Sequence, residues 1–204
     1  IVAKDIDSGR VYPFPPDMLY GFRDWSLGVK QFIMHNGLSF DAPVCNKLLG
    51  TNIKPSQIID TLVLSELFNP IREGIKPHSL GTWGDRLGMP KGEIDSYEVY
   101  TPEMLEYCKQ DVAITHKLYQ VLQKEGKDFS PYSVRLEHDI RVIIDQQQTN
   151  GFALNIQKAM GLYNKLKDEA TKLERWSLTN FDPTVKELKT KTKYIPFNIG
   201  SRQQ

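Results

Sequence analysis

The sequence has 204 residues, of which 40% are hydrophobic and 25% charged, and its formal net charge is +1. This balance is typical of a globular protein with room for one full domain and a smaller piece, and no apolar run approaches the ~20 residues of a membrane helix. Two cysteines are too few for a disulfide framework and favour a reducing compartment, and a net charge near zero means that any nucleic-acid contact must come from local charge.

Strand-like and helical runs alternate through roughly the first 125 residues. The predicted strands are short runs rich in apolar residues, at 1–4, 10–14, 31–35 and 57–60. The predicted helices have cap, proline or glycine signals at one or both ends, at 17–27, 41–49, 61–68, 80–87 and 101–123. Alternation of this kind predicts an α/β layer fold.

After Gly126 the pattern becomes helical. One long helix is predicted between Ser130 and Asn150, and a second begins at Asn155. We therefore predict a domain boundary near residues 125–130 and a second part made entirely of helix. Because the chain begins with Ile1 and not Met, we expect it to be cut from a longer protein.

Asp41 stands where a predicted strand and the Asn36-Gly37 break give way to a helix. On its own, an aspartate before Ala-Pro is most simply a helix cap. A chemical role for Asp41 needs a partner.

Tyr107 and Asp111 offer that partner, because they are four residues apart on a predicted helix and project from one face. Taken alone, this pair is more typical of a tyrosine at the edge of a core and an aspartate on a solvated helix face than of a functional site.

Together the two patterns resemble the second and third motifs of the DEDD exonuclease superfamily. The second motif has Asn followed by an aromatic residue and Asp, here Asn36 and Phe40-Asp41. The third motif is Tyr-x-x-x-Asp, here Tyr107 to Asp111. Both occur in the family's order, one at a strand end and one on a late helix.

Longer segments extend the resemblance over nearly the whole chain. Residues 59–65 and 78–88 resemble the exonuclease domain of phage replicative polymerases of the DNA polymerase I family (family A), especially those of podoviruses. Segments 137–140, 150–152 and 197–201 resemble the opening of the polymerase domain, at the base of the thumb.

This resemblance implies an RNase H-like mixed sheet with flanking helices that lacks its first strand. It assigns residues 1–126 to a 3′→5′ exonuclease domain that is incomplete at its N-terminus. Residues 127–204 would be the helical start of a family A polymerase domain. The implied function is proofreading within a DNA-directed DNA polymerase.

The implied chemistry is hydrolysis of the 3′-terminal phosphodiester with two ions of Mg²⁺ or Mn²⁺. Carried over by motif, Asp41 and Asp111 would be the metal ligands. The Tyr107 hydroxyl would orient the attacking water, and Asn36 and Phe40 would bind the terminal nucleotide.

The family's first motif, Asp-x-Glu, supplies the carboxylate that bridges both metals. Asp5-Ile6-Asp7 is the tempting candidate, but it has Asp in place of Glu and runs directly into Ser8-Gly9, a hairpin-turn signal. The interval to Asp41 is also too short by about one strand and its turn. We therefore expect the first strand to lie upstream of Ile1, and this chain alone to have weak or no exonuclease activity.

The implied partner is DNA: a single-stranded 3′ end for this domain, and a primer–template duplex for the full-length enzyme. The resemblance further implies a monomeric polymerase in the bacterial or phage-infected host cytoplasm, without membrane association and with a processivity factor as an optional partner. A basic stretch, Lys186, Lys189, Lys191 and Lys193, is either a solvated linker or a contact with duplex phosphates.

Two other functions stay open from the sequence. One is a free-standing DEDD exonuclease acting on RNA, against which the polymerase-like tail argues. The other is an exonuclease-like domain that has lost catalysis and serves to bind DNA. Asp41, Tyr107 and Asp111 argue against the second for the parent protein, although it could describe this truncated chain.

Overall fold

The structure is a computed structural model that describes residues 1–92, 94, 96, 98–188, 190–198 and 200. The chain divides into two compact units, Ile1–Asn150 and Gly151–Gln204, here called unit 1 and unit 2. This division in space falls after the boundary predicted near residues 125–130. Each unit is described by itself.

Unit 1 contains two short sheets. In the first, β1 (Val2–Lys4) runs antiparallel to β2 (Val11–Pro13). In the second, β3 (Phe32–Met34) runs parallel to β4 (Ile58–Asp60). All four strands lie inside the predicted runs, so the mixed α/β class predicted from the sequence is confirmed.

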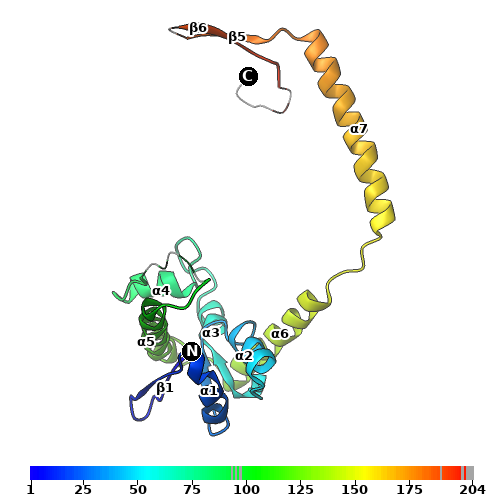
Figure 1. The fold of residues 1–204 in the computed structure, drawn as a ribbon. Coiled ribbons are helices and arrows are strands. Elements are labelled where there is room, and N and C mark those ends of the chain that lie inside the picture. The colour runs from blue at the N-terminus through cyan, green and yellow to red at the C-terminus, as the bar shows by residue number, and fades with distance from the viewer. Residues whose placement is uncertain (93, 95, 97, 189, 199, 201–204) are drawn as a thin grey trace. The chain divides into compact units, whose positions relative to one another are not determined.

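Helices account for most of unit 1 (Figure 1). They are η1 (Pro16–Met18), α1 (Leu19–Ser26), α2 (Asp41–Leu49), η2 (Pro55–Gln57), α3 (Thr61–Phe68), α4 (Leu80–Arg86), α5 (Pro102–Glu125) and α6 (Pro131–Asn150). The long helix α5 contacts α3, α4, β1 and β3, and it therefore lies against a strand of each sheet.

The helix ends follow from local sequence. The Thr101 side chain accepts a hydrogen bond from the Met104 N–H, and Pro102 occupies the first turn of α5. Helix α2 ends at Gly50, whose φ of 68° is a left-handed conformation that glycine adopts without strain. These signals explain why the predicted and observed ends of α2 and α5 agree within two residues.

Two buried clusters hold unit 1 together. The first lies between the β1–β2 sheet, the β3–β4 sheet, α1 and α2. Its buried residues are Phe14, Phe22, Phe32, Leu38, Ala42, Cys45, Ile53, Ile58 and Val63. The second joins α3, α4 and α5, through Leu64, Trp83, Leu118 and Leu122. Both sheets therefore share one core although they are not hydrogen-bonded to each other.

Unit 2 begins with α7 (Ile156–Asn180), which Asn155 caps as predicted. A hairpin of β5 (Thr184–Leu188) and β6 (Lys191–Ile195) follows. The prediction of an entirely helical second part was therefore wrong. β-Branched and aromatic residues alternate with the lysines of β6, and this period favours a strand.

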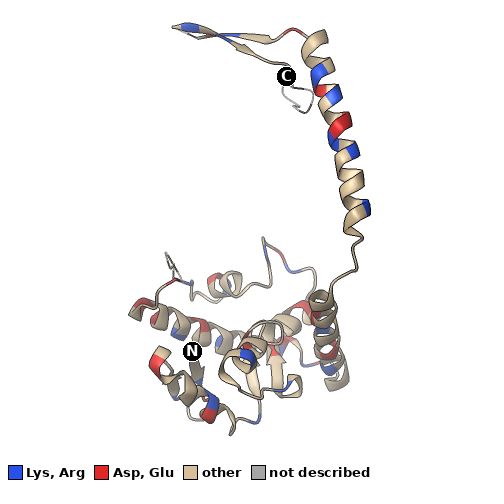
Figure 2. Cartoon of the chain, turned by 45° about the vertical axis from the view of Figure 1, so that its right-hand side comes forward, with Lys and Arg blue, Asp and Glu red and all other residues tan. Residues whose placement is uncertain are grey.

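Charges of both signs mark α7 (Figure 2). Of the basic stretch, Lys186 lies in β5 and Lys191 and Lys193 lie in β6, whereas Lys189 falls outside the described residues. Ile199 and Ser201 of the polymerase-like tail also fall outside them. Within the described part of the chain, no helix is both long and apolar enough to cross a membrane.

Candidate functional site

The turn between β3 and α2, residues 35–40, is called the site loop. The buried carboxylate of Asp60, at the end of β4, accepts hydrogen bonds from the main-chain N–H groups of Asn36 at 2.8 Å and Leu38 at 3.0 Å. It also accepts one from Leu62, which makes Asp60 the N-cap of α3. One carboxylate thus caps a helix and fixes the start of the site loop.

The site loop has a constrained backbone. Asn36 has a φ of 61°, a left-handed conformation that is uncommon for residues other than glycine. A Cβ on Gly37 would lie 2.3 Å from Cβ of Met34, so only glycine fits there. These two residues produce the break that was predicted after the strand.

Asp41 follows the site loop as the first residue of α2, so the capping position belongs to Phe40, whose side chain makes no capping hydrogen bond. Asp41 is exposed, but protein atoms around its carboxyl group, together with the negative charges of Asp60 and Asp111, raise its pKa to about 6. Asp41 and Asp111 are therefore close enough to interact electrostatically.

Asp111 lies one helical turn after Tyr107 on α5, and it is not the fully solvated aspartate that a surface helix would carry. Its side chain is 27% exposed and forms an ion pair with Lys91. The Lys91 Nζ lies 2.9 Å from each carboxylate oxygen, but only Oδ2 meets hydrogen-bond geometry. Oδ1 is buried and has no hydrogen-bond partner among the described residues.

Lys91 is a residue of the candidate site for which the sequence predicted no role. Its Nζ lies 4.7 Å from the centroid of the Tyr107 ring, a cation–π contact. Burial lowers the pKa of Lys91, but its interactions with Tyr107 and Asp111 outweigh burial and leave the pKa above its usual value. In the sequence, Lys91 is a single lysine between the two motifs, and such a residue is only weak evidence of a functional role.

A cleft of about 500 Å³ opens beside the site loop. Its lining comes from the site loop, α3, the segment before α4 and the first residue of α4: His35, Asn36, Leu62, Glu66, Lys76, Pro77, His78, Ser79 and Leu80. Burial lowers the pKa of His35 to about 4, although the charge of Asp60 opposes this, so the imidazole is neutral at pH 7. Asn36 is common to the cleft and to the site loop.

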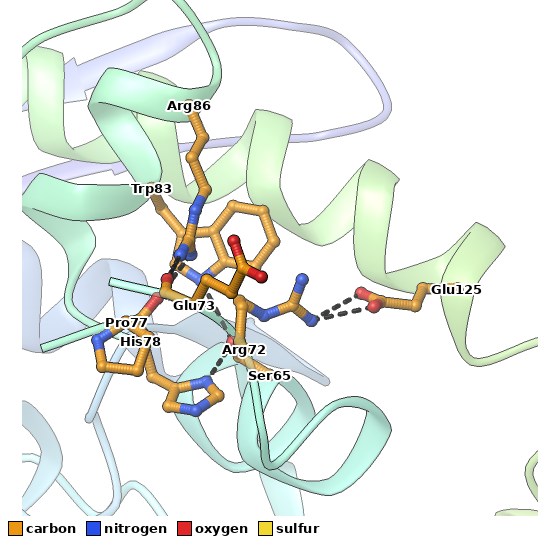
Figure 3. A network of polar contacts seen from close by, with 8 residues as sticks. All are labelled: Ser65, Arg72, Glu73, Pro77, His78, Trp83, Arg86 and Glu125. Carbon is orange, nitrogen blue, oxygen red and sulfur yellow. Dashed lines mark hydrogen bonds and ion pairs between the residues drawn. The ribbon is translucent and has the colours of Figure 1, made fainter. Parts of the chain in front are cut away.

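The wall of this cleft is tied to Trp83 on α4 (Figure 3). The Trp83 Nε1–H donates to Ser65 Oγ at 3.0 Å, and the same oxygen lies 2.8 Å from Nδ1 of His78. Ser65 and Trp83 are both buried, so these bonds fix the position of His78 at the cleft.

Two arginines hold the segment before His78 against the same tryptophan (Figure 3). The Arg72 guanidinium lies 4.5 Å from the Trp83 ring centroid and binds both oxygens of Glu125. Arg86 donates to the carbonyl oxygens of Glu73 and Pro77. The segment before α4 is thereby attached to both α4 and α5.

Helix α6 supports the site from another side. The Ser39 hydroxyl of the site loop donates to Asp145 at 2.7 Å. Arg141 binds Glu66 of α3 at 2.6 Å. Both contacts come from α6, which explains why this helix belongs to unit 1 in space.

Asp5 and Asp7, the rejected candidates for a first motif, lie in the predicted turn between β1 and β2. The Asp5 carboxylate accepts from the N–H groups of Asp7 and Ser8 and from the Ser8 hydroxyl. These hydrogen bonds lower the pKa of Asp5 and commit its carboxylate to the turn.

The donors present suit a hard divalent cation, since Asp41 and Asp111 offer carboxylate oxygen and one oxygen of Asp111 lacks a hydrogen bond. However, no group of three or more His, Cys, Asp or Glu side chains able to hold a metal occurs within the described part of the chain. The two aspartates alone therefore do not provide a complete set of metal ligands within the described residues.

No protein-family model matches the sequence. The sequence is 27% identical in the matched region to the "DNA-directed DNA polymerase" of Escherichia phage T7, and equally so to that of Enterobacteria phage T3. Each match covers 70% of this chain but only 28% of the phage protein, so it spans less than a third of these relatives. The chain is therefore a relative of the phage DNA polymerases of family A.

Proposed function

We propose that unit 1 is the 3′→5′ proofreading exonuclease portion of a DNA-directed DNA polymerase, and that it hydrolyses the 3′-terminal phosphodiester of single-stranded DNA. One observation carries the proposal: Asp41 of α2 and Asp111 of α5 interact electrostatically, although they are far apart in sequence. The relation to the phage polymerases supplies the class of substrate.

Each side chain has a role in this reaction. Asp41 and Asp111 would help to hold two ions of Mg²⁺ or Mn²⁺, which would supply an activated water and stabilise the leaving 3′ oxygen. The Tyr107 hydroxyl orients that water. Asn36 binds the terminal nucleotide from the cleft, and Phe40, whose side chain is 62% exposed, offers a ring on which a base can stack.

A further strand would complete an RNase H-like sheet. β1 and β3 belong to separate sheets, yet both contact α5 and their residues share one buried core. Each has a hydrogen-bonded neighbour on only one side among the described strands. We place the missing strand between them, upstream of Ile1, where it would bring the carboxylates that Asp41 and Asp111 lack.

Residues 127–204 are proposed as the start of the polymerase domain. In that arrangement α6 is the element that joins the two activities, since it follows the proposed boundary in sequence and packs on unit 1 in space. The full-length enzyme would act as a monomer on primer–template DNA, with or without a processivity factor.

The test is release of the 3′ nucleotide from a 3′-fluorescent oligodeoxynucleotide, titrated with Mg²⁺ and Mn²⁺. The longer polypeptide that includes the upstream strand should be active, and Asp41→Ala and Asp111→Ala should each abolish that activity. Asp168→Asn, on the exposed surface of α7, is the control for loss of one negative charge. Loss of activity in the control as well would remove the support for a specific site.

The 204-residue chain should degrade the same oligonucleotide weakly or not at all. Strong Mg²⁺-dependent degradation that Asp5→Ala or Asp7→Ala abolishes would overturn the placement of the strand. Binding of DNA without hydrolysis, even by the longer polypeptide, would instead support the second candidate, a catalytically incomplete DNA-binding fragment. The incomplete set of metal donors among the described residues favours that candidate for the isolated chain.

A further inference from the structure

Lys91 occupies the position that a metal ion would need at Asp111. Its Nζ lies 2.9 Å from each of the two carboxylate oxygens. The pair is only partly exposed, at 22% for the lysine side chain and 27% for the aspartate. A half-buried, charge-assisted contact of this kind is stronger than an ion pair on an open surface.

The fold places Lys91 there by fixing its neighbours. The Met89 N–H donates to the carbonyl oxygen of Gly84 in α4 at 2.8 Å, and the Pro90 carbonyl accepts from Gln110 of α5. A Cβ on Gly92 would lie 4.0 Å from the Tyr107 ring, so the chain passes close over that ring. The backbone is thus anchored on two helices.

The side chain of Lys91 can move to another partner, although its backbone is held in place. Lysine has four rotatable side-chain bonds, and its ammonium is a compact point charge with three donors. An ammonium 2.9 Å from each oxygen of Asp111 takes up the space in which a divalent ion would bind the same two oxygens, and the two cations would repel each other there. A divalent ion that binds both oxygens of Asp111 therefore displaces the ammonium.

We propose that Lys91 is an exchangeable cation of the site: its ammonium neutralises Asp111 while no metal is bound, and it moves to a phosphate of the DNA strand when a divalent ion takes Asp111. The phosphate half of this exchange rests on the proposed function. The metal half does not, since it concerns Lys91 and Asp111 alone. Lys91 would then hold the substrate that the metals act on.

Lys91→Met tests both halves, because it keeps the length of the side chain and removes its charge. Binding of Mn²⁺ is measured without DNA from the electron paramagnetic resonance signal of the free ion. Binding of a 3′-fluorescein oligothymidylate is measured by anisotropy in Ca²⁺. The variant should bind Mn²⁺ about tenfold more tightly, equivalent to about 1.4 kcal/mol, and the oligonucleotide about tenfold more weakly.

Lys109→Met is the matched control. Lys109 lies on the same helix as Asp111 and loses the same charge, but its partner is Glu106, an exposed residue of that helix. The control should change both affinities by less than about twofold.

The opposite changes expected in the Mn²⁺ and oligonucleotide affinities of Lys91→Met distinguish this exchange from a structural ion pair. Unchanged or weaker Mn²⁺ binding by Lys91→Met would overturn the exchange at Asp111, whether or not the chain proves to be an exonuclease. Tighter Mn²⁺ binding with unchanged oligonucleotide affinity would overturn the phosphate half alone. Weaker binding of both ligands with a lower melting temperature would show a structural ion pair.

Reductive methylation of the wild-type chain gives a second measurement if the variant does not fold. Lys91 should be methylated slowly without metal and several-fold faster with Mn²⁺, as read by peptide mass, while Lys109 is unaffected. Equal rates of Lys91 methylation with and without Mn²⁺ would contradict the exchange.

Discussion

The Nε2 atom of His138 accepts a hydrogen bond from the main-chain N–H of Asp60 at 2.9 Å. His138 is only 3% exposed, and its other ring nitrogen, Nδ1, lies 2.7 Å from the carbonyl oxygen of Val134. Because Nε2 accepts, the proton of the neutral ring lies on Nδ1 and is donated to Val134. Helix α6 thus holds the backbone of the residue whose carboxylate fixes the site loop.

His138→Ala should destabilise unit 1 by about 2–4 kcal/mol, because it leaves a cavity and a buried N–H without a partner. Urea unfolding measures the loss, and amide exchange at Asn36 and Leu38 should accelerate beyond the global change. The control is His116→Ala, since His116 is less buried and accepts its hydrogen bond from the Lys4 ammonium rather than from a buried main-chain N–H. Equal losses in the two variants would contradict the supporting role of His138.

Gly37→Ala should cost about 1–3 kcal/mol, because its Cβ would collide with the side chain of Met34. Gly28→Ala is the matched control in the same unit, since its nearest atom would lie at an ordinary 3.7 Å. Thermal unfolding of both variants is the measurement. A Gly37→Ala variant as stable as the control would show that the site loop tolerates a different backbone.

Stability should depend on pH through His35. Its pKa is lowered to about 4 in the folded chain, against 6.5 for the ordinary group, so the unfolded chain binds more protons between these values. The stability that depends on an uncharged His35 is therefore fully present above about pH 6.5 and is lost as the pH falls toward 4. Urea unfolding at pH 4.5 and 6.5 measures this change.

Asp41 acts in the opposite direction over part of that range, because its raised pKa makes the folded chain bind more protons between about pH 4 and 6. The comparison of wild type with His35→Gln isolates the histidine. The variant should lose less stability than the wild type between pH 6.5 and 4.5. An identical pH dependence in the two proteins would exclude a buried neutral His35.

Mn²⁺ binding should weaken as the pH falls through about 6, because Asp41 must lose its proton before it can bind a metal. Asp41→Asn should bind more weakly at pH 7.5 and show less dependence on pH in this range. Titrations with Mn²⁺ at pH 5.5, 6.5 and 7.5 measure this effect. A wild-type affinity that stays constant over these values would place Asp41 outside the metal site.

Local signals explain what the sequence predicted well. Thr101 and Gly50 act within one helical turn, and the Asp5–Gly9 turn is made by neighbours in the chain, so a single sequence contains the necessary information. The same holds for the spacing of Tyr107 and Asp111, which one helix sets.

Tertiary contacts explain what the sequence did not predict. Lys91 reaches Asp111 only because a loop passes over α5, and His138 reaches Asp60 only because α6 packs against α3. No periodicity encodes either contact. The β5–β6 hairpin was not predicted for a different reason. Its lysines are typical of a solvated linker, and this feature was given more weight than the alternation of residues that favours a strand.

The most direct measurement of the central claim is the product released from a 3′-labelled single-stranded oligodeoxynucleotide by the longer polypeptide in Mg²⁺. We expect stepwise release of nucleoside 5′-monophosphates from the 3′ end. Asp41→Ala and Asp111→Ala should each reduce the rate by about 100-fold or more, since each removes a proposed metal ligand. Release at an undiminished rate by both variants would contradict the proposed exonuclease site.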